Sequence, residues 1–430
     1  MSTVDAEAGL RDLAPSGRER LRALLDSTYL RGLAFVLTLS WLGRAAWIHE
    51  FPKAASTDAA SWAVVVHQLQ HGHNPYVTTN LLGWGPLWLI VLYALDHTAG
   101  VLGVSFLLAL RLLLIGIESL LIAAIYACIH RLTGDLRLAR STVLFGISLN
   151  PIAILMVCQH CNFDVLVALF MFWGALEVMA YAKARDVTIL LSASLAFGLG
   201  ALAKTVPIAL APLLADGVRR ETRRAQVVAL VALLAPLGLG LAVLFALAPS
   251  AVTHHVLLYH STSDVFGVSG LLTLGGLHGL AGAWTHAGTL LMLAWIVIGW
   301  WMLRRTPLDP ARTLLLTGLV MLAIPTFGPG YATQYVYWWM PFLVATYPLF
   351  DRTWRRLLLA LYGVACATYL FDYAIEPTYG GFLDRTYVAT HALLELGATL
   401  QSPGWQTVVR TPYFLLCVVV FAAGVRRMRA

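Results

Sequence analysis

Long apolar segments recur along the chain and decide what it can fold into. One of them, VVALVALLAPLGLGLAVLFAL at 227–247, holds no charged residue. A helix of about 20 apolar residues crosses a bilayer, and lipid offers the backbone no hydrogen-bond partner, so a span must satisfy its own backbone groups. Of the 430 residues, 59% are hydrophobic and 12% charged, against about 25% charged in soluble domains. The sequence therefore predicts an all-α polytopic membrane protein.

Basic residues gather in short clusters between the apolar segments. By the positive-inside rule such clusters mark cytoplasmic turns, so the net charge of +7 is explained by topology and indicates no nucleic-acid partner. The clusters are Arg18/Arg20/Arg22/Arg31, Arg131/Arg137/Arg140, Lys183/Arg185, Arg219/Arg220/Arg223/Arg224, Arg304/Arg305/Arg312, Arg352/Arg355/Arg356 and Arg426/Arg427/Arg429. The outer segments are then about 49–82, 158–164, 204–207, 248–284, 326–335 and 372–405.

The expected organisation is a cytoplasmic segment 1–29, a single transmembrane domain 30–425 of about ten to thirteen helices, and a cytoplasmic tail 426–430. Residues 1–28 are polar and do not resemble a cleaved signal peptide. The helix count stays open between 83 and 130, where either the 102–130 segment breaks near Gly116 or one helix lies in the outer leaflet. Residues around Lys204 resemble a V-shaped dip, and 267–282 resembles a re-entrant helix.

The first outer loop carries Asp58, just past a Pro and a Lys and among small residues. A carboxylate in this place can accept a proton from an incoming hydroxyl group. The alternative is structural, because Ser56, Thr57 and Asp58 open an amphipathic helix and Asp is a favoured N-cap. From the loop alone, the cap is the stronger interpretation.

Two polar stretches contain metal-ligand residue types, HGHNPY at 71–76 and CQHCNFD at 158–164. Neither is accompanied by the second cluster that a zinc or redox site needs, so no metal is expected. The first stretch is interpreted as a turn with Tyr76 at the membrane interface. In the second, His160, Asn162 and Asp164 are expected to face a cavity, because polar groups near membrane depth are costly and mark sites.

Three further features lie in or beside apolar segments. Lys204 is the lone charge in GLGALAKTVPIALAPLL and must either snorkel to water or hold a carboxylate or phosphate. The loop 254–267 offers His254, His255 and His260, which suit a polar headgroup. In FGPGYATQYVYWWMPFL, an aromatic belt explains the tryptophans but not Gln334 next to Tyr335.

The ordered set of these segments resembles the GT-C superfamily of membrane glycosyltransferases, which use polyprenyl-phosphate sugars. NPY followed by GWGPLW, then QHCNFD, GLGALAKTVPIALAP and ATQYVYWWMPFL, is most similar to the bacterial polyprenyl-phosphomannose-dependent mannosyltransferases of the phosphatidylinositol mannoside type. The chain departs from that pattern in two places. Asp58 is the one acidic residue close to the loop's centre, with Glu50 eight positions earlier, and Gly85-Pro86 replaces a YPP sequence.

The resemblance implies an inverting enzyme of the bacterial plasma membrane that transfers a hexose, with mannose favoured, to a glycolipid or glycan at the outer face. It makes Asp58 the general base and assigns the donor phosphate to Lys204, His254, His255 and His260. The substrate-binding residues it implies are His160, Asn162, Asp164, Gln334, Tyr335 and Tyr76. Neither a cofactor nor a metal is expected. The alternative is a flippase for a lipid-linked sugar, which would explain broken helices at membrane depth but predicts an inverted repeat that the sequence lacks.

Overall fold

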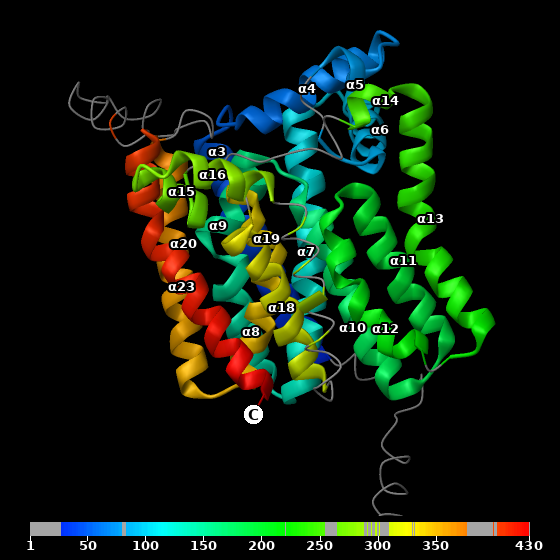
Figure 1. Ribbon diagram of the computed structural model, residues 1–430, viewed down its shortest axis with the longest axis vertical. Helices are drawn as coiled ribbons and strands as arrows, with labels where there is room; N and C mark the ends of the chain where they lie inside the picture. Colours follow the sequence, from blue (N-terminus) through cyan, green and yellow to red (C-terminus); the bar gives the residue numbers. More distant parts are fainter. Residues whose placement is uncertain are drawn as a thin grey trace, which may run out of the picture.

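The computed structural model describes residues 27–79, 83–219, 221–253, 265–287, 309–328, 332–375 and 402–429, with a few isolated positions between them. Within these ranges all regular structure is helical, and most helices run along one common axis (Figure 1). Five helices are long and apolar enough to cross a membrane, or six if the bent pair Leu136–Ser148 and Pro151–His160 forms one span. The all-α polytopic architecture predicted from the sequence is confirmed.

The main helices of the bundle are α3 (Ser27–Glu50), α7 (Phe106–Thr133), α10 (Asp164–Ala184), α11 (Val187–Ala203), α13 (Arg223–Leu247), α18 (Pro310–Phe327), α19 (Val336–Thr346), α20 (Arg352–Ile375) and α23 (Pro403–Arg429). The other elements are α4 (Thr57–Gln70), α5 (Pro75–Thr78), α6 (Pro86–Leu102), α8 (Leu136–Val143), η1 (Leu144–Ser148), α9 (Pro151–Leu155), η2 (Met156–His160), η3 (Val206–Leu210), α12 (Ala211–Arg219), α14 (Pro249–Ala251), α15 (Gly267–Leu274), α16 (His278–His286), η5 (Thr333–Tyr335) and η6 (Tyr347–Leu349).

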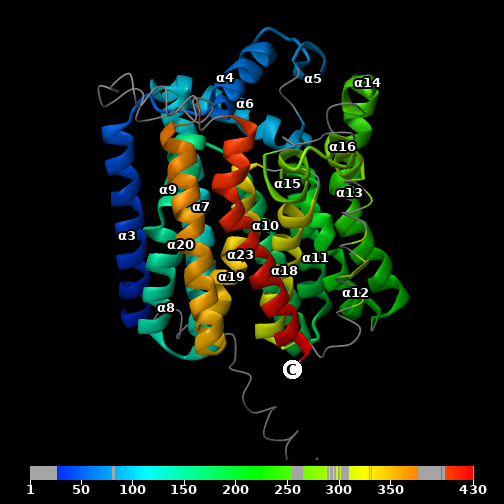
Figure 2. The ribbon, with the colours of Figure 1, turned by 60° about the vertical axis from the view of Figure 1, so that its left-hand side comes forward.

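The two ends of the bundle differ in composition. Helices α4, α5 and α6 gather at one end, which we call the α4 end, and the C-terminus of α23 lies at the other (Figures 1 and 2). The α7–α8 turn also lies at that second end, which we call the basic end because it carries the clusters 131–140 and 426–429. The loop that carries α4 and these two basic clusters thus lie at opposite ends of the bundle, as the charge pattern predicts.

The structure bears on three segments whose course the sequence left open. Helix α7 runs through Gly116 without a break, so a break at that residue is the wrong alternative. Helix α6 has 17 residues and lies at the α4 end, where a helix in the outer leaflet would lie (Figure 2). Residues 267–282 form α15 and the start of α16 rather than one re-entrant helix, with the chain turning at Gly275 and Gly276.

A buried charge pair ties three helices together in the interior. The guanidinium Nε of Arg44 in α3 lies 2.5 Å from Oε2 of Glu118 in α7, and both side chains are fully buried. The hydroxyl of Tyr337 in α19 donates to the other Glu118 oxygen. Breaking such a buried pair costs about 3–5 kcal/mol because it leaves an uncompensated charge. This pair therefore fixes the arrangement of the helices behind the candidate site.

Candidate active site

The N-terminus of α4 places Asp58 at the α4 end of the bundle. Ser56 is the N-cap, since its Oγ accepts a hydrogen bond from the backbone N–H of Ala59 and donates one of 2.7 Å to the carbonyl of His160. The interpretation of Asp58 as the helix cap is therefore wrong. Asp58 lies one residue inside the helix, where the positive end of the helix dipole favours a carboxylate.

The Asp58 carboxylate is held through one of its oxygens. Oδ2 accepts hydrogen bonds from Asn162 Nδ2 at 2.7 Å and from His160 Nε2 at 3.0 Å. Burial disfavours the charged form, but the hydrogen bonds from His160 and Asn162 and the nearby Lys204 ammonium outweigh it and lower the Asp58 pKa. The side chain is 27% exposed, and Oδ1 bonds to none of the residues that the structure describes. One oxygen is anchored and the other is open.

His160 links this carboxylate to the opposite wall of the site. Its ring is 2% exposed, and its Nδ1 faces the hydroxyl of Tyr373 in α20 and lies 3.4 Å from Oγ1 of Thr333 in η5. Because Nε2 points at a carboxylate, that nitrogen carries the proton and Nδ1 accepts from Tyr373. The histidine is thus oriented by two helical elements that follow it by more than 170 residues.

Arg111 joins the two backbone segments that form the site. Although it lies within the apolar helix α7, its guanidinium donates to four carbonyls, those of Cys158 at 2.6 Å, Pro52 at 2.8 Å, Ala54 at 2.5 Å and Phe51 at 3.4 Å. These contacts fix the segment before Asp58 against the segment before His160. The sequence interpretation missed Arg111, yet a charged residue in the 102–130 segment carries the same signal that singled out Lys204.

The loop 158–164 forms a turn held by hydrogen bonds to its own backbone. Cys161 adopts a left-handed conformation with φ of 55°, and its carbonyl accepts a 3.2 Å hydrogen bond from Trp62 Nε1. Asn162 Oδ1 accepts from the backbone N–H of Asp164 at 2.9 Å. Both cysteines of the C-x-x-C are buried free thiols. Within the described ranges, no three His, Cys, Asp or Glu side chains lie where they could share a metal ion.

Lys204 lies next to this loop, in a buried pair with Asp164. Its Nζ is 2.9 Å and 3.0 Å from the two Asp164 oxygens, and Asp164 is fully buried. Lys204 is itself 7% exposed, so the snorkelling interpretation is wrong. Four aromatic rings surround the ammonium at 5.1–5.6 Å, those of Trp84, Phe163, Tyr335 and Trp338. The predicted dip is a turn at Lys204, after which the chain returns through η3 and α12.

The remaining candidates lie at different distances from this centre. Tyr335 belongs to it, since its ring stacks on Trp338 at 3.9 Å. Tyr76 is one step removed, because its buried hydroxyl donates to the Trp84 carbonyl at 2.8 Å; it supports the ring beside Lys204. Gln334 is buried, 7% exposed, in η5 beside Thr333. The predicted phosphate ligands His254, His255 and His260 lie outside the described residues.

The HGHNPY stretch forms the turn that the sequence predicts. Gly72 has φ of 72°, a left-handed conformation that glycine adopts without strain. Asn74 caps α5 by accepting from the Tyr76 N–H at 3.1 Å. His71 Nδ1 contacts the His67 carbonyl at 2.8 Å, so the histidine is engaged with its own helix.

A solved structure has a similar arrangement of helices. The fold is similar to that of ArnT. That structure, from Cupriavidus metallidurans, is bound to undecaprenyl phosphate; the TM-score is 0.52, with 15% sequence identity over 92% of this chain and 76% of ArnT. No family model matches the sequence, and no curated protein sequence matches it significantly. The similarity to ArnT thus lies in the fold and not in the sequence.

Proposed function

We propose that the protein is an inverting glycosyltransferase that moves a hexose from a polyprenyl phosphate to a hydroxyl group of a glycolipid or glycan. Two independent observations support this class, the ordered GT-C-like segments of the sequence and a fold similar to ArnT, whose structure holds a polyprenyl phosphate. Mannose is the proposed hexose, on the resemblance to the mannosyltransferases. The observation that carries the proposal is the Asp58 carboxylate, anchored through Oδ2 with Oδ1 open.

The proposed reaction uses this carboxylate as the general base. The acceptor oxygen attacks the anomeric carbon on the face opposite the phosphate, and its proton passes to Oδ1 of Asp58. The bond between the anomeric carbon and the phosphate oxygen breaks, so that polyprenyl phosphate leaves and the configuration inverts. The low pKa of Asp58 keeps the base charged at neutral pH, and proton transfer accompanies attack, when the acceptor hydroxyl becomes strongly acidic.

Lys204 is the proposed cation for the leaving phosphate. Two of its hydrogen bonds go to Asp164, and an ammonium group has three donors, so one N–H remains for a phosphate oxygen. Preorganised cations stabilise charge where it develops in the transition state. In this proposal Asp164 holds Lys204 in place, while His254, His255 and His260 supply further phosphate ligands.

The other assigned side chains act around the two substrates. His160 and Asn162 orient the base, while Gln334 and Tyr335 line the groove for the donor. Tyr76 supports that groove through Trp84. We place the protein in the bacterial plasma membrane as one transmembrane domain, 30–425, with both termini cytoplasmic and the site at the outer face. The opposite placement of α4 and the basic clusters supports this orientation (Figure 1).

The direct test is the Asp58→Asn variant, assayed with radiolabelled polyprenyl-phosphate mannose and a panel of glycolipid acceptors. General-base catalysis contributes about 10²–10⁴-fold, so turnover should fall by that factor. Glu50→Gln is the matched control, because it removes an exposed carboxylate beside the same loop and should leave turnover unchanged. Near wild-type turnover by a correctly folded Asp58→Asn variant would refute the mechanism. If other hexoses but not mannose were transferred from polyprenyl phosphate, only the assignment of the sugar would change.

A further inference from the structure

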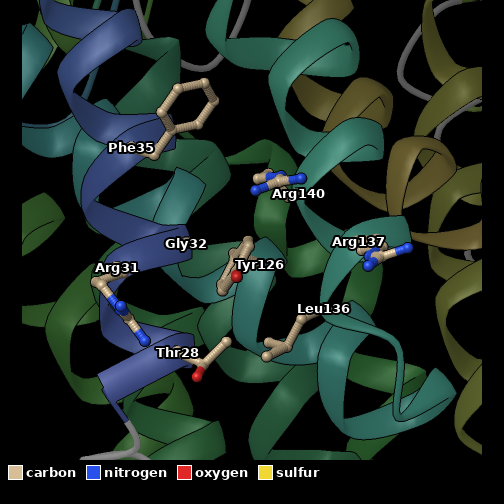
Figure 3. Close-up of a pocket in the computed structure, with 8 residues that line it drawn as sticks. All are labelled: Thr28, Arg31, Gly32, Phe35, Tyr126, Leu136, Arg137 and Arg140. Atoms are coloured by element: carbon tan, nitrogen blue, oxygen red, sulfur yellow. The ribbon is translucent and has the colours of Figure 1, made fainter.

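A cavity of about 470 Å³ lies at the basic end of the bundle, away from the candidate active site. Helices α3, α7 and α8 form its walls (Figure 3). Its lining residues are Thr28, Arg31, Gly32, Phe35, Tyr126, Leu136, Arg137 and Arg140. A volume of this size suits a headgroup-sized ligand.

Arginine side chains give the cavity a positive charge. Three of its lining residues are arginines, and none of them forms an ion pair with a carboxylate in the part of the chain that the structure describes. Arg31 donates to the Ser27 carbonyl at 3.0 Å, and Arg140 lies 5.7 Å from the centre of the Phe35 ring. Most of their guanidinium donors are therefore available for an anion, and arginine suits phosphate because its planar fork matches the phosphate oxygens.

A buried hydroxyl adds a donor to the same wall. The Tyr126 side chain is fully buried, and its hydroxyl has no hydrogen-bond partner among the described residues. It lies against Gly32 of α3, where a side chain would collide with it. An unpaired buried hydroxyl is destabilising, and a ligand oxygen that reached it from the cavity would recover that loss. Figure 3 shows Tyr126 between Arg31 and Phe35 on α3 and Arg140 on α8.

On both walls of the cavity, the residues that follow the arginines in the chain include exposed apolar side chains. On α3, Arg31 is followed by Phe35 and Leu42, which are 48% and 58% exposed. On the neighbouring wall, Arg137 and Arg140 are followed by Phe145 in η1, which is 70% exposed. Exposed apolar side chains on a membrane protein face lipid tails. The arginines therefore lie where the headgroup layer meets the hydrocarbon, with apolar surface beside them to receive acyl chains.

We infer that this cavity binds the phosphate headgroup of an anionic phospholipid in the leaflet at the basic end. The three arginines and Tyr126 hold the phosphate, and the acyl chains follow the apolar surface of α3 and η1. Basic pockets between membrane helices bind anionic headgroups in this way. The site is separate from the proposed donor site, so it does not depend on the proposed reaction.

The test compares ligands on the purified full-length protein in detergent. Phosphatidylglycerol, phosphatidylcholine or inorganic phosphate is titrated, and the thermal unfolding midpoint is followed. A ligand that binds the folded state alone raises that midpoint, so phosphatidylglycerol should raise it while the other two leave it unchanged. A rise with inorganic phosphate equal to that with phosphatidylglycerol would overturn the lipid assignment.

The decisive variant is Arg31→Gln/Arg137→Gln/Arg140→Gln. The three arginines are exposed, so replacing them should leave the thermal unfolding midpoint of the protein without added lipid unchanged. The apparent affinity for phosphatidylglycerol should fall roughly a hundredfold, because each basic residue near an anionic surface contributes a factor of about five. The matched control removes equal charge from exposed positions that do not line the cavity, in Arg352→Gln/Arg356→Gln/Arg426→Gln. Equal losses of affinity in the two triple variants would show that net charge alone causes the effect, and would overturn the proposed site.

Discussion

The buried pair of Lys204 and Asp164 offers the sharpest test of how the site is held together. We consider the variants Lys204→Met and Asp164→Asn, alone and combined, because each removes one charge with little change in volume. In the wild-type protein the Nζ–oxygen distances are 2.9 Å and 3.0 Å. Both side chains are buried, so solvent screens the pair little.

The two single variants should differ in cost. Lys204→Met leaves Asp164, which is fully buried, without its cation, and removing one partner of a buried pair costs about 3–5 kcal/mol. Asp164→Asn leaves Lys204 with an amide oxygen to donate to and with four rings at 5.1–5.6 Å, each worth about 0.5–2 kcal/mol. We therefore expect a loss of only about 1–2 kcal/mol for Asp164→Asn.

The double variant completes the cycle. It leaves no buried charge, so its cost should be about 1–2 kcal/mol, the price of one imperfectly bonded amide. The coupling energy is then at least about 2 kcal/mol. The assay is unfolding in mixed dodecyl maltoside–SDS micelles, followed by tryptophan fluorescence, since Trp84 and Trp338 flank the ammonium. Additive losses, or a larger loss for Asp164→Asn than for Lys204→Met, would refute the reasoning.

Two further predictions concern the base and the loop beside it. The Asp58 pKa is lowered, so kcat/KM should hold through neutral pH and fall only as the pH drops through that lowered pKa. Asn162→Ala removes one hydrogen bond that stabilises the carboxylate, so the acid limb of the pH profile should move to higher pH; an unmoved limb would assign it to another group. A Cβ at Gly85 would collide with the Leu202 carbonyl, whereas a Cβ at Gly116 would meet no atom within 4 Å. Gly85→Ala should therefore lower the unfolding midpoint and the turnover, while Gly116→Ala should raise the free energy of unfolding by about 1 kcal/mol. Equal effects of the two variants would contradict the packing at residue 85.

The fold was accessible from the sequence because a bilayer restricts the possible structures. Apolar length predicts helices, and basic clusters predict the ends at which they turn. The same logic singled out His160 and Lys204 as candidates, since a polar residue beside an apolar segment is unexpected without a role. Asp58 became the candidate base through the resemblance to the GT-C superfamily. This reasoning could not predict which residue caps α4. Ser56 and Asp58 are equally good caps, and the choice depends on the His160 carbonyl, 104 residues from Ser56.

The pairing of charged side chains inside the site could not be predicted from the sequence for a similar reason. Lys204 and Asp164 are 40 residues apart, and no helical spacing relates them. A search for every lone charge in an apolar segment would have added Arg111, Arg44 and Glu118, because such charges are expected to bond inside the protein. It would not have shown that Arg111 bonds to backbone carbonyls while Arg44 bonds to Glu118.

The anchoring of Asp58 by His160 has a consequence for biosynthesis. The two residues are 102 positions apart, and translation proceeds at about 5–20 residues per second. Helix α4 therefore leaves the ribosome roughly 5–20 s before the loop that receives it. During that interval the Arg111 contacts to Pro52 and Ala54 can already form, because α7 is made between the two segments. The nascent protein would then hold residues 52–54 in place before Asp58 has a partner, and the hydrogen bonds to Asp58 form only when residues 158–162 arrive.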